Sequence, residues 1–99
     1  MNIEKIHAKV RANEYVYSQH AEIERVADGL TFVQIEEALL DGAILEDYPD
    51  EGRGERCLVV GFSDETPIHV VCGWRGENIV IITVYIPGPP KFADPWTRA

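Results

Sequence analysis

The sequence has few of the features that mark membrane, secreted or metal-binding proteins. No run reaches the roughly 18 to 20 consecutive apolar residues of a membrane-spanning helix. The first residues, MNIEKIHAKVRANE, lack the apolar core of a signal peptide. Only two cysteines occur, Cys57 and Cys72, and neither lies in a CxxC spacing. We therefore expect a cytoplasmic protein whose thiols are buried as small hydrophobic groups rather than used in a disulfide or a metal site.

Positive charge is scarce in the middle of the chain. Residues 13–52 hold eleven carboxylates and a single cation, Arg25, while the formal net charge of the whole protein is −8. This middle segment should repel phosphate. A nucleic acid would have to contact the first helix, which holds Lys5, Lys9 and Arg11, or the sheet and its turns, which hold Arg53, Arg56, Arg75, Lys91 and Arg98. The alternative is an acidic, soluble surface that binds no nucleic acid.

The length and composition indicate one small globular domain. Ninety-nine residues, 45% hydrophobic and 26% charged, suffice for one modest core and not for two. We predict a single domain over residues 1–99, with a helical part at 1–42, an antiparallel sheet at 43–86 and a proline-rich tail at 87–99. Pro87, Pro89, Pro90 and Pro95 should prevent a regular strand ladder, so we expect Pro87–Pro90 to be extended and Phe92 and Trp96 to pin the tail onto the body.

The strongest pattern is a β-hairpin. Ile68–Trp74 and Ile79–Ile86 are rich in β-branched and aromatic residues, and Arg75-Gly76-Glu77-Asn78 supplies the turn between them. The second run is apolar at nearly every position, which predicts a central strand covered on both faces. Cys57–Phe62 should be the third strand of the sheet, and the less apolar Ala43–Tyr48 a fourth strand at an edge.

Three helices are predicted before the strands. The first spans about ten residues around the apolar stripe of Ile3, Ile6 and Val10. Tyr15–Tyr17 is a short β-favouring link, after which Ser18 caps a helix over Gln19–Ala27. Thr31 and Gln34 form a capping box for a third helix, Phe32–Leu40. The predicted fold class is α+β, with N-terminal helices packed on a sheet of three or four antiparallel strands.

Four segments together resemble a small bacterial and cyanobacterial family classed as a domain of unknown function. They are Ser18-Gln19-His20-Ala21, Gly42–Tyr48, Pro67–Val71 and Ile82–Tyr85. That family is similar to ribonuclease toxins of the RelE, BrnT and MqsR kind, in which helices pack against a twisted antiparallel sheet. The resemblance implies an mRNA-cleaving toxin with an RNA substrate and an antitoxin protein as partner. Glu24 and Asp28 stand where such sequences often have arginine.

Metal-independent RNA cleavage needs a base for the 2′-hydroxyl, an acid for the leaving oxygen and cations near the phosphate. His20, His69 and Tyr85 are the candidate catalytic residues. The candidate substrate-binding residues are Arg25, Arg53, Arg56, Trp74, Arg75 and Lys91. A three-residue loop in the hairpin would pair His69 with Tyr85, whereas a two- or four-residue turn would send them to opposite faces. The sequence does not decide between these registers.

Each of the three candidate catalytic residues also has a purely structural interpretation. His20 could tie its helix to the sheet, His69 could be a hydrogen-bonded core histidine, and Tyr85 an amphipathic sheet residue. A metal site would require His20, Glu24 and His69 to meet, and we expect neither a metal nor a cofactor. The alternative function is a non-catalytic module that binds a protein partner through the sheet.

Overall fold

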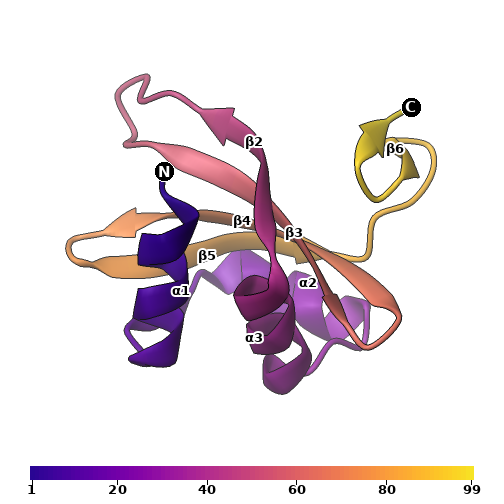
Figure 1. Ribbon diagram of the computed structural model, residues 1–99, viewed down its shortest axis with the longest axis horizontal. Coiled ribbons are helices and arrows are strands. Elements are labelled where there is room, and N and C mark those ends of the chain that lie inside the picture. Colours follow the sequence, from indigo (N-terminus) through magenta and orange to yellow (C-terminus); the bar gives the residue numbers. More distant parts are fainter.

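The computed structural model describes residues 1–99 and has the predicted α+β class, with helices on one face of a sheet (Figure 1). The three helices are α1 (Ile3–Arg11), α2 (Gln19–Ala27) and α3 (Phe32–Asp41). The strands are β1 (Tyr15–Tyr17), β2 (Ala43–Tyr48), β3 (Arg56–Ser63), β4 (Thr66–Arg75), β5 (Asn78–Tyr85), β6 (Phe92–Asp94) and β7 (Thr97–Arg98). None of the helices is long and apolar enough to cross a membrane.

The helix boundaries follow the capping signals in the sequence. The side chain of Ser18 accepts from the amide of Ala21, three residues into α2. Thr31 and Gln34 form both bonds of the predicted capping box at the start of α3. These bonds satisfy amides that the helix itself leaves without acceptors, which is why the residues fix where each helix begins.

The main sheet has five strands in the order β1-β5-β4-β3-β2: four antiparallel strands, β2 to β5, as predicted, and one additional strand. The additional strand is Tyr15–Tyr17, expected as a link, which pairs in parallel with Ile79–Ile81 of β5. Without a neighbour, the outer edge of the apolar β5 would leave backbone N–H and C=O groups without hydrogen-bond partners. The short strand β1 provides these partners over Ile79–Ile81. Strand β5 therefore has strand neighbours on both sides over Ile79–Ile81 only, and β2 lies at an edge as predicted.

The helices cover one face of the sheet and form the main core. Ile6, Ile35 and Leu39 from the helices are fully buried together with Ile68 and Val70 of β4. Successive strand residues point to opposite faces. The other face carries Leu58, Val60 and His69, which are also buried but lie outside this cluster.

That second face is covered at one end by the C-terminal tail. Residues Phe92–Asp94 and Thr97–Arg98 pair as a two-stranded hairpin, on the side of the sheet away from the helices (Figure 1). The expectation that the tail forms no regular ladder was therefore wrong beyond Pro90, whereas Phe92 pins the tail onto the sheet as expected. Phe92 is 1% exposed, and burying its ring against the sheet provides the driving force for folding the tail back.

Candidate functional site

A β-bulge in β5 brings His69 and Tyr85 together. The β4–β5 turn has two residues, Gly76 and Glu77, because Arg75 pairs with Asn78. With this turn alone His69 and Tyr85 would fall on opposite faces, but the register shifts between Cys72, which pairs with Ile81, and Val71, which pairs with Thr83. Ile82 is the extra residue. His69 therefore pairs directly with Tyr85. Neither predicted register included this combination of a two-residue turn and a bulge.

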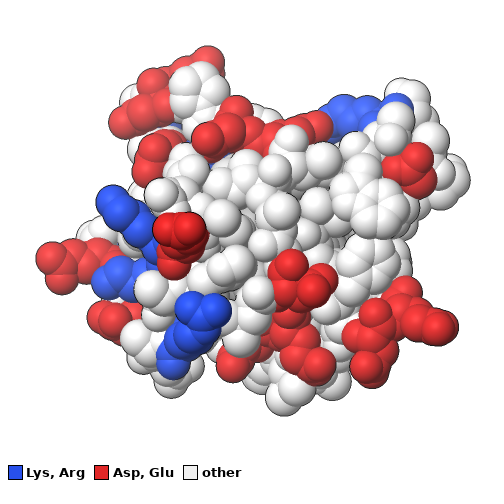
Figure 2. Space-filling model, in the orientation of Figure 1, with Lys and Arg blue, Asp and Glu red and all other residues white.

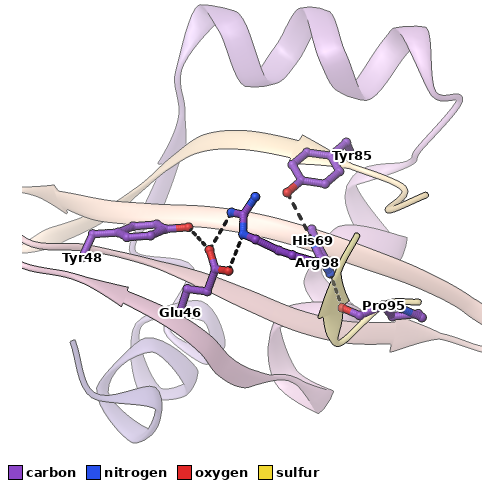
Figure 3. A network of polar contacts seen from close by, with 6 residues as sticks. All are labelled: Glu46, Tyr48, His69, Tyr85, Pro95 and Arg98. Atoms are coloured by element: carbon purple, nitrogen blue, oxygen red, sulfur yellow. Dashed lines mark hydrogen bonds and ion pairs between the residues drawn. The ribbon is translucent and has the colours of Figure 1, made fainter. Parts of the chain in front are cut away.

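His69 is buried and uses both ring nitrogens. Its Nε2 lies 2.6 Å from the carbonyl oxygen of Pro95, and its Nδ1 lies 3.2 Å from the hydroxyl of Tyr85 (Figure 3). A carbonyl oxygen only accepts, so Nε2 must donate. In the neutral ring Nδ1 is then the acceptor, and the Tyr85 hydroxyl donates to it. The two hydrogen bonds fix both the orientation and the tautomer of the imidazole.

The surroundings keep both partners neutral. Burial lowers the pKa of His69 below its ordinary value of 6.5, although the Pro95 carbonyl and Glu46 act in the other direction. Burial also raises the pKa of Tyr85 above 10. Both shifts arise because a charged side chain is unfavourable in a poorly hydrated site. Near pH 7 the pair is thus a neutral imidazole accepting from a neutral phenol.

The C-terminal hairpin closes over His69 and is fastened by one ion pair. Arg98 donates to both carboxylate oxygens of Glu46, at 2.6 and 2.7 Å, and Tyr48 donates to the same carboxylate (Figure 3). The Phe92 ring stands edge-on to His69, 4.5 Å between centroids, with the Arg98 guanidinium 4.8 Å from its centre. His69 is 0% exposed, so it can influence a ligand only through Tyr85.

Tyr85 borders a cleft of about 270 Å³. Its lining includes Glu24 from α2, Lys91 and Phe92 from the tail, and Ile86, Gly88, Pro89 and Pro90 from the chain that follows β5. His20 is exposed on the first turn of α2, and its Nε2 lies 3.2 Å from Glu24 Oε1. The cleft therefore gathers a phenol, a carboxylate and an ammonium group, with an imidazole next to the carboxylate. No group of three metal-ligating side chains lies close enough to hold a metal ion.

Helix α2 is attached to the free part of the β5 edge by polar side chains. Beyond the end of β1, Ser18 donates to the carbonyl of Ile82, Glu24 accepts from the amide of Val84, and Asp28 accepts from the amide of Ile86. Residues four apart on a helix are about 6 Å apart along its axis, close to the spacing of alternate strand residues. Glu24 and Asp28 can therefore serve successive edge amides, and this fixes Glu24 beside Tyr85.

The predicted substrate-binding residues do not form one surface. Lys91 alone lines the cleft. Arg25 lies on the helical side, where it pairs with Glu22, donates to the carbonyl of Leu30 and stacks on Phe32. The others lie toward the opposite end of the sheet, where Arg53 and Arg75 are exposed in turns and Arg56 is half-buried. Trp74 is half-buried and donates its indole N–H to Glu55.

Several residues of the site were missed by sequence reasoning. Glu24 was considered only as a metal ligand and as a replacement for the arginine of the similar family, and Glu46, Phe92 and Pro95 were given no part in the site. Phe92 carried the clearest signal, as one of two aromatic residues in the proline-rich tail. Glu46 and Arg98 carried none, because their ion pair joins residues 52 positions apart.

Comparison with known protein families gives one match. The family model described as a domain of unknown function, DUF4258, matches residues 17–86. This range includes His20, Glu24, His69 and Tyr85 and ends before the C-terminal hairpin. Searches of curated proteins and of solved structures give no match.

Proposed function

The chain belongs to the DUF4258 family, and we propose that its activity is metal-independent cleavage of RNA in the cleft beside Tyr85. In this proposal it is a toxin-like endoribonuclease that acts on mRNA in the bacterial cytoplasm and is neutralised by an antitoxin protein. The observation that carries the proposal is the pairing of Tyr85 with His69 at a cleft that also holds Glu24 and Lys91.

The proposed reaction is attack of a ribose 2′-oxygen on the adjacent phosphorus. The 2′-hydroxyl gives its proton to the Tyr85 oxygen while the Tyr85 proton passes to Nδ1 of His69, so His69 is the final proton acceptor. The Pro95 carbonyl and the Glu46 carboxylate favour the imidazolium that results. His69 is thus a positioning and relay residue, and Tyr85 is the group that touches the substrate.

The remaining groups serve the phosphate and the leaving group. As the 2′-oxygen bonds to phosphorus, the bond from phosphorus to the 5′-oxygen breaks, and that oxygen takes a proton from His20. Glu24, whose Oε1 lies 3.2 Å from His20 Nε2, orients the imidazole ring of His20. Lys91 offsets the negative charge that develops on the phosphate oxygens. The products are a 2′,3′-cyclic phosphate and a free 5′-hydroxyl.

The decisive experiment compares two tyrosine variants on RNA in the presence of EDTA. Tyr85→Phe removes one oxygen and keeps the ring, so we expect cleavage to slow by about 100-fold or more. Tyr15→Phe is the matched control, because Tyr15 is also half-buried and loses a hydrogen bond, to Glu36, on the helical side. Wild-type protein that leaves RNA intact, or two variants with equal rates, would refute the proposal.

A non-catalytic protein-binding module is the second candidate function. It is favoured by the acidic surface, with a net charge of −8, and by the single cation in the cleft. In this case Tyr85→Phe would alter only stability, and expression of the protein would not arrest growth. Growth arrest that depends on the Tyr85 hydroxyl would exclude this candidate.

A further inference from the structure

Helix α2 leaves its large apolar side chains exposed. Glu24, and Asp28 directly after the helix, accept hydrogen bonds from backbone amides at the edge of β5, and Ala21 is the only buried residue of the helix. Its apolar residues turn outward, with Ile23 62% and Val26 63% exposed. A helix at the surface of a soluble protein normally places such residues against the core. The outer side of α2 is therefore an apolar surface that the fold leaves uncovered.

The start of α3 extends this apolar surface. Phe32 is 50% and Val33 66% exposed. Arg25 of α2 lies with its guanidinium 4.1 Å from the centre of the Phe32 ring and donates to the Leu30 carbonyl. These contacts hold the end of α2 against the beginning of α3. We call Ile23, Val26, Phe32 and Val33 the outer helix surface.

Carboxylates lie next to the outer helix surface, because Glu36 and Glu37 are one helical turn from Phe32 and Val33 on α3. Between them, α2, α3 and their connection carry six carboxylates and one cation, Arg25. Arg25 pairs with Glu22 only. The other five carboxylates have no Lys or Arg partner: Glu24, Asp28, Glu36, Glu37 and Asp41. A ligand for this surface must therefore bring apolar side chains together with positive charge.

We propose that the outer helix surface is the docking site of a basic amphipathic helix from a partner protein. The apolar side chains of that helix, repeating at i, i+3 and i+4, would cover Ile23 and Val26, and its Lys or Arg residues would face the carboxylates. A second copy of this chain fits the surface less well, because it carries the same net charge of −8. The inference does not depend on whether the Tyr85 cleft is catalytic.

The test uses synthetic peptides of about 18 residues, long enough to form a helix on the surface. One is an amphipathic leucine and lysine peptide, the second has the same composition in scrambled order, and the third replaces lysine with glutamate. Fluorescence anisotropy should show binding of the first peptide, with affinity falling as salt increases. The scrambled and acidic peptides should bind at least about 10-fold more weakly.

Variants then locate the binding site. Ile23→Ser and Val26→Ser change exposed side chains, so the fold should persist, and each should weaken binding of the amphipathic peptide by about 10-fold. Trp96→Ser is the matched control, since Trp96 is 57% exposed but lies in the C-terminal tail. Equal binding of the scrambled peptide, or binding unchanged in both variants, would overturn the proposal. So would sedimentation showing that Ile23 and Val26 mediate self-association instead.

Discussion

Glu46 is the side chain whose protonation should release the C-terminal hairpin. Its hydrogen bonds from Arg98, and secondarily from Tyr48, lower its pKa from 4.5 to about 2. A carboxylate with a depressed pKa stabilises the folded state above its unfolded pKa. That contribution is lost as the pH falls toward the folded pKa. The hairpin should therefore be held firmly above about pH 4.5 and loosen between that pH and about 2.

Tryptophan fluorescence can follow this release. In a Trp74→Phe background the only indole is Trp96, whose ring lies 5.6 Å from that of Phe62. We expect its emission to shift toward that of free indole as acid protonates Glu46. In Arg98→Gln the main cause of the lowered pKa is gone, so the shift should occur at a higher pH. Identical midpoints in the two proteins would show that the Glu46–Arg98 pair does not hold the hairpin.

The residues whose roles were predicted correctly from the sequence are those that form hydrogen bonds with residues close to them in the chain. Thr31 caps α3 through Gln34, three positions away, and Ser18 caps α2 in the same manner. Such bonds depend on local spacing, which is visible in a sequence. The bond between His69 and Pro95 depends instead on how the tail returns to the sheet. No rule based on local sequence spacing predicts the hydrogen bond between His69 and Pro95.

Among the strands, the β4–β5 pair shows why register could not be predicted. Turn length alone would have separated His69 from Tyr85, and the bulge at Ile82 reverses that outcome. Nothing about an isoleucine in an apolar run indicates that it will be the extra residue. At this bulge β5 changes neighbours, from the backbone of β1 to the side chains of α2. The site therefore depends on a junction between elements rather than on one element.

The contact between α3 and β3 requires a glycine. A Cβ at Gly61 would lie 1.8 Å from the carbonyl oxygen of Ala38, a backbone atom that cannot move without shifting the helix. We expect Gly61→Ala to destabilise the protein by about 1 to 3 kcal/mol or more, the range for overpacking in a core. Urea denaturation measures the change directly.

Gly88→Ala is the control for this contact. No atom lies within 4 Å of a Cβ at Gly88, and its φ is not positive. The substitution should therefore leave the urea midpoint nearly unchanged. Equal stability losses at Gly61 and Gly88 would mean that α3 does not approach β3 as closely as the structure indicates.

The distribution of charge over the surface of the whole protein limits where RNA can bind. Figure 2 shows Asp and Glu spread over much of one face, while Lys and Arg form groups near α1 and beside the C-terminal hairpin. Two of the candidate phosphate-binding residues, Lys91 and Arg75, lie far apart on the sheet side of the molecule. Lys91 lines the cleft, and Arg75 lies at the far turn of β4, six residues from His69. At about 3.3 Å per residue this is roughly 20 Å along the strand.

This separation lets RNA binding report which end of the sheet is used. If RNA occupies the cleft beside Tyr85, Lys91→Gln should weaken binding and reduce the slope of log affinity against log salt by about 1. Arg75→Gln removes the same charge from the far turn and should leave that slope unchanged. The measurement is best made with a 2′-deoxy RNA analogue, because it binds without being cleaved. A slope that falls in Arg75→Gln and not in Lys91→Gln would place the RNA on the β4–β5 turn, away from Tyr85, and the proposed cleavage site would then be wrong.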